Sequence, residues 1–211
     1  MKTQTKAKTG RRYGGLSDGE RRAERRARLL TSGFELFGSQ GFGNTTIPML
    51  CSRAGVTARH FYEEFDSREA VLRELFDSIA DEAIELVRAS LRTSAAAASS
   101  PYDRIHASNR RYFDFMTGDP RRARIYALES LGVSEELERH RRAKRETFVK
   151  LINPDQTNVL APLDSRLLSI AVSGAAHALL LDWVLAAPQP AVETLIDTLT
   201  TIWMRTLKLE R

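Results

Sequence analysis

The sequence predicts an all-α protein of about nine helices, in which a small three-helix unit precedes a larger helical bundle. Apolar residues recur at i, i+3 and i+4 along the whole chain, and the two-residue alternation of β-strands is missing. Glycine and proline fall between segments of helical length. With 211 residues, 42% of them hydrophobic, the chain can bury a core in one large domain or in two smaller ones.

The N-terminal unit is bounded by helix signals. Ser17 and Glu20 have the spacing of a capping box, so the first helix is predicted to begin after Ser17 and to end near Gly41. Residues 1–16 lack the apolar pattern and are expected to form a flexible basic arm. Gly55 tolerates the positive φ of a sharp turn and separates two short helices. These helices are expected at about 47–54 and 57–64.

A long helix that begins at Ser67 is predicted to connect this unit to the bundle. Pro101 and Pro120 are expected to start further helices, because proline fits the first helical turn. The chain is therefore divided into the arm at 1–16, an N-terminal domain at 17–66 and a C-terminal domain at 67–211. The helices of the C-terminal domain are expected at about 67–92, 101–117, 120–131, 134–153, 163–186 and 191–209.

Positive charge is concentrated near the N-terminus. Residues 1–28 contain ten Lys or Arg and three acids, a local charge of +7, whereas the whole chain carries +5. This asymmetry predicts that the N-terminal part binds a polyanion; for residues 1–16 alone, a solubilising tail is the alternative. Cys51 is the single cysteine and no secretory h-region follows the basic start, so a reducing, cytoplasmic location is expected.

Residues 46–65 meet the local requirements of a helix-turn-helix. Thr46 can cap the first of its helices, and Thr57 can cap the second, the recognition helix. Gly55 supplies the turn between them, and Phe61 is expected to face inward against the first long helix. Proteins with this motif place the N-terminal half of the recognition helix in the major groove of DNA.

The helix-turn-helix lies within a longer motif that extends on both sides of it. In this sequence the motif comprises Gly41-Phe42, Thr45-Thr46-Ile47, Ala54-Gly55-Val56-Thr57, Tyr62, Phe65, Arg68-Glu69 and Leu72. On these residues the segment 33–72, and more loosely the whole chain, resembles the TetR family of one-component transcriptional regulators. The resemblance implies a homodimeric repressor of a pseudo-palindromic double-stranded DNA operator, with a C-terminal domain for dimerisation and for a small-molecule effector.

The expected base contacts lie on the recognition helix. Arg59 is the main candidate, because a guanidinium can bind guanine O6 and N7 with two hydrogen bonds. His60 is a second candidate, and Ala58 can touch only a thymine methyl group. The resemblance implies that Tyr62 binds phosphate; the alternative is a ring packed on the first helix.

Further DNA contacts are expected beside helix N-termini and in the arm. Thr46 and Arg68, beside helix N-termini, are expected to contact phosphates. Thr57, which caps the recognition helix, is a further candidate for DNA binding. Arg11 and Arg12 of the arm are expected to enter the minor groove or to add salt-sensitive affinity.

Three other residues of this region are not expected to make favourable contacts with DNA. Glu64 stands where the TetR family often has histidine, and an acid near phosphate is mildly unfavourable. Pro48 cannot donate a hydrogen bond at a position where relatives can contact a base. Arg53 is expected to be solvated.

The last two predicted helices carry wide apolar stripes that include Leu195 and Ile202. The resemblance implies that they form a four-helix dimer interface, although the periodicity alone equally suits an internal core. Residues 167–187 are also long and apolar enough to span a bilayer. His177 and Asp182 within this segment favour a buried helix, so no membrane partner is expected.

The resemblance also implies an effector pocket among the helices of the C-terminal domain, and its apolar composition predicts a small, largely apolar effector. For each candidate side chain the alternative is a purely structural role. The selected ligand-binding candidates are His106, Arg110, Phe113, Tyr126 and Trp183, drawn from a wider set that adds Tyr102, Asn109, Tyr112, Met116, Glu129, Phe148 and His177.

Other site types are disfavoured by the sequence. The basic run 139–145 follows three glutamates on the same predicted helix, which favours a solvated face over a second DNA site. The chain has no phosphate-binding glycine loop, no nucleophile elbow and no paired histidines with metal-ligand spacing. No catalytic residue, metal or cofactor is therefore expected; an enzyme and a helical protein that acts only through protein contacts are the minor alternatives.

Overall fold

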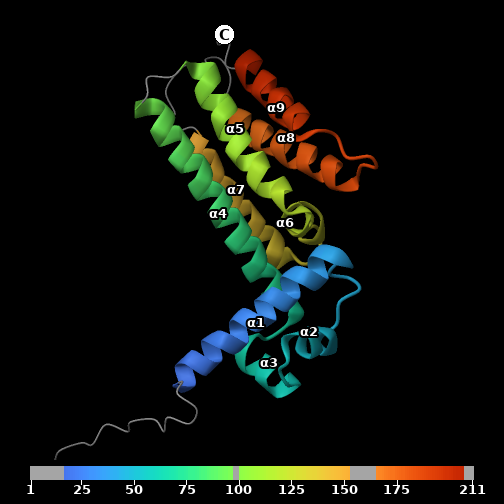
Figure 1. Cartoon of the computed structure of the whole chain (residues 1–211). Helices are drawn as coiled ribbons and strands as arrows, with labels where there is room; N and C mark the ends of the chain where they lie inside the picture. The colour runs from blue at the N-terminus through green and yellow to red at the C-terminus, as the bar shows by residue number, and fades with distance from the viewer. Residues whose placement is uncertain (1–16, 97–99, 153–164, 207–211) are drawn as a thin grey trace, which may run out of the picture.

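The computed structural model describes residues 17–96, 100–152 and 165–206, and these ranges contain α-helices, one π-helical segment and no strand (Figure 1). The expected all-α class is confirmed. The elements are α1 (Asp18–Ser39), α2 (Ile47–Ala54), α3 (Ala58–Glu64), α4 (Arg68–Ala96), α5 (Pro101–Gly118), α6 (Pro120–Arg124), η1 (Ile125–Glu129), α7 (Glu135–Ile152), α8 (Ser165–Leu185) and α9 (Val192–Thr206).

Helices α1, α2 and α3 form a small head at one end of the molecule (Figure 1). The predicted capping box is present, since the Ser17 hydroxyl accepts from the Glu20 N–H and the Glu20 carboxylate accepts from the Ser17 N–H. Gly55 ends α2 with φ 63°, the left-handed conformation that the sharp turn requires. Phe61 of α3 is fully buried in the head, as its spacing predicts.

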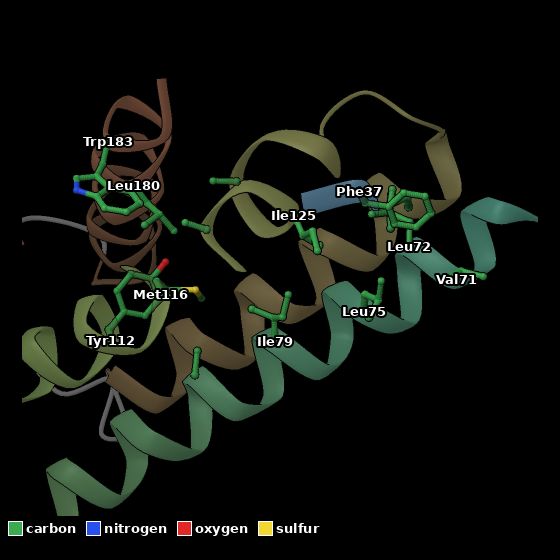
Figure 2. Close-up of a cluster of buried hydrophobic side chains, with 14 of the residues drawn as sticks. Phe37, Val71, Leu72, Leu75, Ile79, Tyr112, Met116, Ile125, Leu180 and Trp183 are labelled. Atoms are coloured by element: carbon green, nitrogen blue, oxygen red, sulfur yellow. The ribbon is translucent and has the colours of Figure 1, made fainter. Parts of the chain in front are cut away.

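Helices α4 to α9 form the body, in which α4 runs beside α5 and α7 (Figure 1). Apolar side chains from α4, α5, η1 and α8 meet in a continuous core, part of which Figure 2 shows. Tyr112 and Met116 of α5 face Leu180 and Trp183 of α8 in that core (Figure 2).

Helix α1 packs closely against the body through its C-terminal half. A Cβ added at Gly38 would lie 2.5 Å from Arg121 Cβ and 3.2 Å from Arg121 Cα. At Gly33 an added Cβ would lie 2.7 Å from Val71 Cγ1 of α4. These distances are shorter than ordinary contacts, so both glycines allow a separation of helices that larger residues would prevent.

The segment 120–131 departs from its prediction as a single α-helix. The α-helical turn α6 ends at Arg124, and a π-helical turn, η1, follows it. Glu129 in η1 accepts a hydrogen bond from the Phe42 N–H of the head at 2.7 Å, and Arg124 Nε donates to the same carboxylate at 2.8 Å. A π-turn is a local irregularity that is common at functional positions. Here it connects the body directly to the loop that precedes α2.

Candidate nucleic-acid interface and inner cavities

The helix-turn-helix is built from two capped helices and the Gly55 turn. The Thr46 hydroxyl accepts from the Met49 N–H at 3.4 Å, and the Thr57 hydroxyl accepts from the His60 N–H at 3.3 Å. These bonds satisfy N–H groups that the first turn of a helix otherwise leaves unpaired. Both threonines are also exposed, so their caps lie at the surface of the head.

One face of α3 presents its side chains to solvent. The Arg59 side chain is 87% exposed, and its Nε lies 3.2 Å from Glu63 one turn further on. Ala58 is exposed and His60 is half-buried. Tyr62 is 59% exposed and meets the edge of Phe61, so its ring is not buried against α1. This surface has the side chains and the exposure that major-groove contact requires.

Arg68 makes contacts within the protein that the sequence did not indicate. Its Nη1 donates to the carbonyl oxygens of Phe42, at 3.0 Å, and Thr45, and its guanidinium lies 4.4 Å from the centre of the Phe42 ring. The side chain thus fixes the start of α4 to the loop before α2. Its contact with phosphate stays a prediction, as do those of Thr46 and Tyr62; Arg11 and Arg12 lie outside the described residues.

Three arginines of α1 hold the C-terminal end of the recognition helix. Arg22 Nη2 donates to the Glu63 carbonyl at 2.9 Å, and Arg26 Nη1 donates to the Glu64 carbonyl at 2.6 Å. Arg22 and Arg25 also lie 3.2 and 3.4 Å from a Glu64 carboxylate oxygen. These cations satisfy the last carbonyls of α3 and complement the negative end of its dipole.

This arrangement corrects two expectations. The Glu64 side chain is 3% exposed and paired, so it does not face DNA phosphates as a free acid. Part of the N-terminal positive charge is also used inside the head, because Arg22, Arg25 and Arg26 all pair with acids there. The pattern of charges along the sequence could not show this, since the partners lie about forty residues away.

The body contains an apolar cavity of about 100 Å³. It is lined by side chains of five helices, α4, α5, α7, α8 and α9, and its few polar groups come mainly from serine, asparagine and tyrosine. Its lining residues are Val87, Leu91, Ile105, Ser108, Asn109, Tyr112, Phe148, Val172, Ser173, Ala176, Leu199 and Trp203. We call this space the apolar cavity.

A second cavity of about 180 Å³ lies between α4, η1, α7 and α8 and has a polar lining. It is lined by Phe76, Tyr126, Arg141, Arg145, Ser173, Gly174 and His177. We call this space the arginine cavity. The run 139–145 therefore departs in part from the expected solvated face: Arg141 and Arg145 line this cavity, whereas Arg139 and Arg142 are exposed.

The five selected ligand-binding candidates are dispersed in the structure. Tyr126 lines the arginine cavity, whereas the other four line neither cavity. Phe113 is fully buried in the core, and buried Trp183 donates from Nε1 to the Pro190 carbonyl at 3.1 Å. His106 and Arg110 lie 3.5 and 3.7 Å from the α9 acids Asp197 and Glu193.

Four members of the wider candidate set do line the cavities, namely Asn109, Tyr112, Phe148 and His177. Periodicity placed these residues on helices but could not separate the cavity-lining positions from the filled core. Trp203 of α9 lines the apolar cavity instead of Trp183. Within residues 17–96, 100–152 and 165–206, no group of three or more His, Cys, Asp or Glu side chains is placed to hold a metal ion.

Helix α8 is long and apolar enough to cross a membrane by length and composition, with a mean hydropathy of 1.6. In the structure it packs against α7, η1 and α9. Its outward face is mostly apolar: Leu167 and Leu185 are 58% and 63% exposed, and Ala171 and Ala178 lie exposed between them, although the charged Asp182 is exposed on the same face.

The exposed recognition helix and the helical body with its inner cavities define a helix-turn-helix DNA-binding regulator. Residues 29–75 match the model of the bacterial regulatory proteins of the tetR family. The structure is similar to that of the transcriptional regulator FadR from Bacillus subtilis in complex with stearoyl-CoA (TM-score 0.73, 16% identity, 85% of this chain and 98% of that chain). The match of residues 29–75 together with the shared fold supports a TetR-family transcription regulator.

Two further proteins are similar to this chain, one in fold and one in sequence. The secondary repressor NalD of the MexAB-OprM efflux pump in Pseudomonas aeruginosa matches with a TM-score of 0.67 and 19% identity over 89% of this chain and 97% of that chain. The HTH-type transcriptional activator FasR from Mycolicibacterium smegmatis is 29% identical over 114 residues, 53% of this chain. That match spans half of the length of FasR. All of these relatives are described as transcription regulators.

Proposed function

We propose that this protein is a homodimeric, cytoplasmic repressor that binds a pseudo-palindromic operator and is released from it by a small effector. The observation that carries the proposal is the capped recognition helix, on which Arg59 and Tyr62 are exposed while Phe61 anchors the helix. A two-fold dimer presents two such helices to successive major grooves, which favours an operator with two related half-sites.

The apolar cavity supports an effector site in the body. Its walls are mainly aliphatic and aromatic, with Asn109, Tyr112 and Ser173 as the polar groups that can orient a ligand. The FadR relatives from Bacillus subtilis and Thermus thermophilus were crystallised with stearoyl-CoA and lauroyl-CoA. These complexes support a ligand with an apolar chain for this protein also.

The π-turn η1 supplies a route from the cavities to the head. Tyr126 of η1 lines the arginine cavity and stacks on Phe76 of α4, with ring centres 5.2 Å apart. Three residues further on, Glu129 accepts from the Phe42 N–H of the head. A ligand that displaces Tyr126 would therefore also disturb the bond at Phe42. To move an operator-binding equilibrium from 1:99 to 99:1, it must favour the released state about 10⁴-fold.

Operator binding is tested by fluorescence anisotropy with labelled duplexes from the region upstream of the protein's own gene, followed by footprinting. We expect one protected site with two related half-sites, bound at least 10³-fold more tightly than unrelated duplex at the same salt concentration. Equal affinity for the upstream and unrelated duplexes would contradict the proposal.

Activation of transcription is the second candidate, because the relative FasR is described as an activator. A reporter fused to the bound promoter separates the two directions of regulation. Deletion of the gene for a repressor raises reporter expression, whereas deletion of the gene for an activator lowers it.

A further inference from the structure

The arginine cavity carries positive charge that the apolar cavity lacks. Arg141 and Arg145 lie one turn apart on α7 and both line the cavity. Arg141 is 7% exposed, and its Nη1 donates to Glu138 Oε2 at 3.1 Å. Arg145 Nη2 lies 4.0 Å from the other oxygen of the same carboxylate. Two guanidinium groups thus share one acid, which leaves a positive charge at a site that is partly withdrawn from water.

The remaining polar groups of this cavity are neutral donors and acceptors. Burial, followed by the charges of Arg141 and Arg145, lowers the pKa of His177 to about 4, so the imidazole is uncharged near pH 7. Burial raises the pKa of Tyr126, which keeps its hydroxyl protonated. Ser173 contributes a further hydroxyl. The cavity therefore offers hydrogen-bond donors and net positive charge to any ligand that enters it.

The two cavities adjoin each other. Ser173 lines both, and the side chain of Tyr112 in the apolar cavity interacts with that of Tyr126 in the arginine cavity. At about 100 and 180 Å³, each cavity is smaller than the roughly 300–1,000 Å³ of typical ligand pockets. A ligand that occupies both meets an apolar wall at one end and two guanidinium groups at the other.

We propose that the effector is an amphipathic anion, whose carboxylate or phosphate group binds Arg141 and Arg145 while its apolar part occupies the apolar cavity. The proposal rests on the proposed function and narrows its largely apolar effector to one with a single charged end. Guanidinium groups bind carboxylate and phosphate through paired, charge-assisted hydrogen bonds. An anion also compensates the buried positive charge, which a neutral molecule of the same shape leaves uncompensated.

Three probes with the same eight-carbon chain test the charge requirement by isothermal titration calorimetry: octanoate, octyl phosphate and 1-octanol. We expect at least one of the anions to bind about tenfold to a hundredfold more tightly than 1-octanol, which is the range for hydrogen bonds to charged groups. The better of the two anions identifies the head group as carboxylate or phosphate.

Variants of α7 assign the preference to the arginine cavity. Arg145→Met changes the more exposed of the two arginines, with 40% side-chain exposure, and is expected to abolish the anion preference while 1-octanol still binds. Arg142→Met, an exposed neighbour on the same helix, is the matched control and is expected to keep the preference. Arg141→Met is tested in parallel, with thermal unfolding to verify that the variant folds.

The proposal is overturned if 1-octanol binds as tightly as both anions, if none of the probes binds, or if folded Arg141→Met and Arg145→Met both keep the anion preference. Operator affinity without any probe is measured on the same samples. Intact operator binding together with one of these results refutes the anionic effector alone, whereas absence of specific operator binding refutes the proposed function.

Discussion

Arg59 is the main candidate for a base contact, and its side chain is 87% exposed. Arg59→Ala should weaken operator binding by about 1–3 kcal/mol and relax the preference at one position of each half-site, because a bidentate contact to guanine is lost. Arg53→Ala is the matched control, since Arg53 is also exposed and also pairs with an acid but lies on α2, outside the recognition helix. Binding to a set of single-base operator variants measures both effects. An unchanged base preference in Arg59→Ala would assign the readout to another side chain.

His177 makes the free energy of unfolding depend on pH. Its pKa is about 4 in the folded protein and about 6.5 in the unfolded chain, so only the unfolded chain takes up a proton as the pH falls through this window. Stability is fully present above pH 6.5 and is lost progressively toward pH 4. Between pH 7 and pH 5 the wild type should lose about 1–2 kcal/mol more than His177→Gln. Urea unfolding at the two pH values measures the difference, and equal losses would show that the histidine is not withdrawn from protonation.

The close approach of α1 to the body depends on the absence of a side chain at Gly38. Gly38→Ala should destabilise the protein by about 1–3 kcal/mol, because the added methyl group meets both the side chain and the backbone of Arg121. Gly19→Ala is the same change at the exposed start of the same helix, where only Ser17 Oγ lies within reach at 4.0 Å. It should leave stability unchanged or raise it by up to about 1 kcal/mol. Urea unfolding compares them, and similar effects would mean that α1 has room to move.

The contact between η1 and the loop before α2 depends on the carboxylate of Glu129. Glu129→Gln weakens the acceptor that holds the Phe42 N–H and removes the charge that pairs with Arg124. Octanoate should then change operator affinity severalfold less than in the wild type while binding equally well, as expected for a loss of about 0.5–2 kcal/mol of coupling. Glu135→Gln, at an exposed position of α7, is the control. If octanoate changed operator affinity as much in Glu129→Gln as in the wild type, the cavities would be coupled to the head through other residues.

Dimerisation involves the whole molecule. The structure shows which residues of the last two helices can be changed to test it. Leu195 is 3% exposed inside a single chain, so a charge there would disrupt the core of the protomer rather than an interface. The exposed apolar face of α8 is the better target. Ala178→Asp should abolish the dimer, because it places an unpaired charge in an apolar seam. Ala143→Asp, also at an exposed helical alanine, should remain dimeric. Sedimentation velocity distinguishes the two outcomes; a dimeric, folded Ala178→Asp variant would move the interface away from α8.

The features that depend on residues close together in the chain could be predicted from the amino-acid sequence. Ser17 with Glu20, Thr46 and Thr57 mark helix starts, because a cap is formed by residues within one turn of each other. Gly55 marks the turn, because positive φ is a property of a single residue. The helix-turn-helix and the family motif around it consist almost entirely of such local signals.

Contacts between residues that are far apart in the chain are seen only in the folded structure. Helical periodicity places Arg141 and Arg145 on one face of α7, but it cannot tell whether that face meets solvent or His177 of α8. The same limit applies to Glu64, whose partners lie on α1, and to Phe113 and Tyr112, which are adjacent in sequence but divide between the filled core and a cavity wall. Cavities and ion pairs of this kind arise from the packing of distant helices, and no local pattern of residues records that packing.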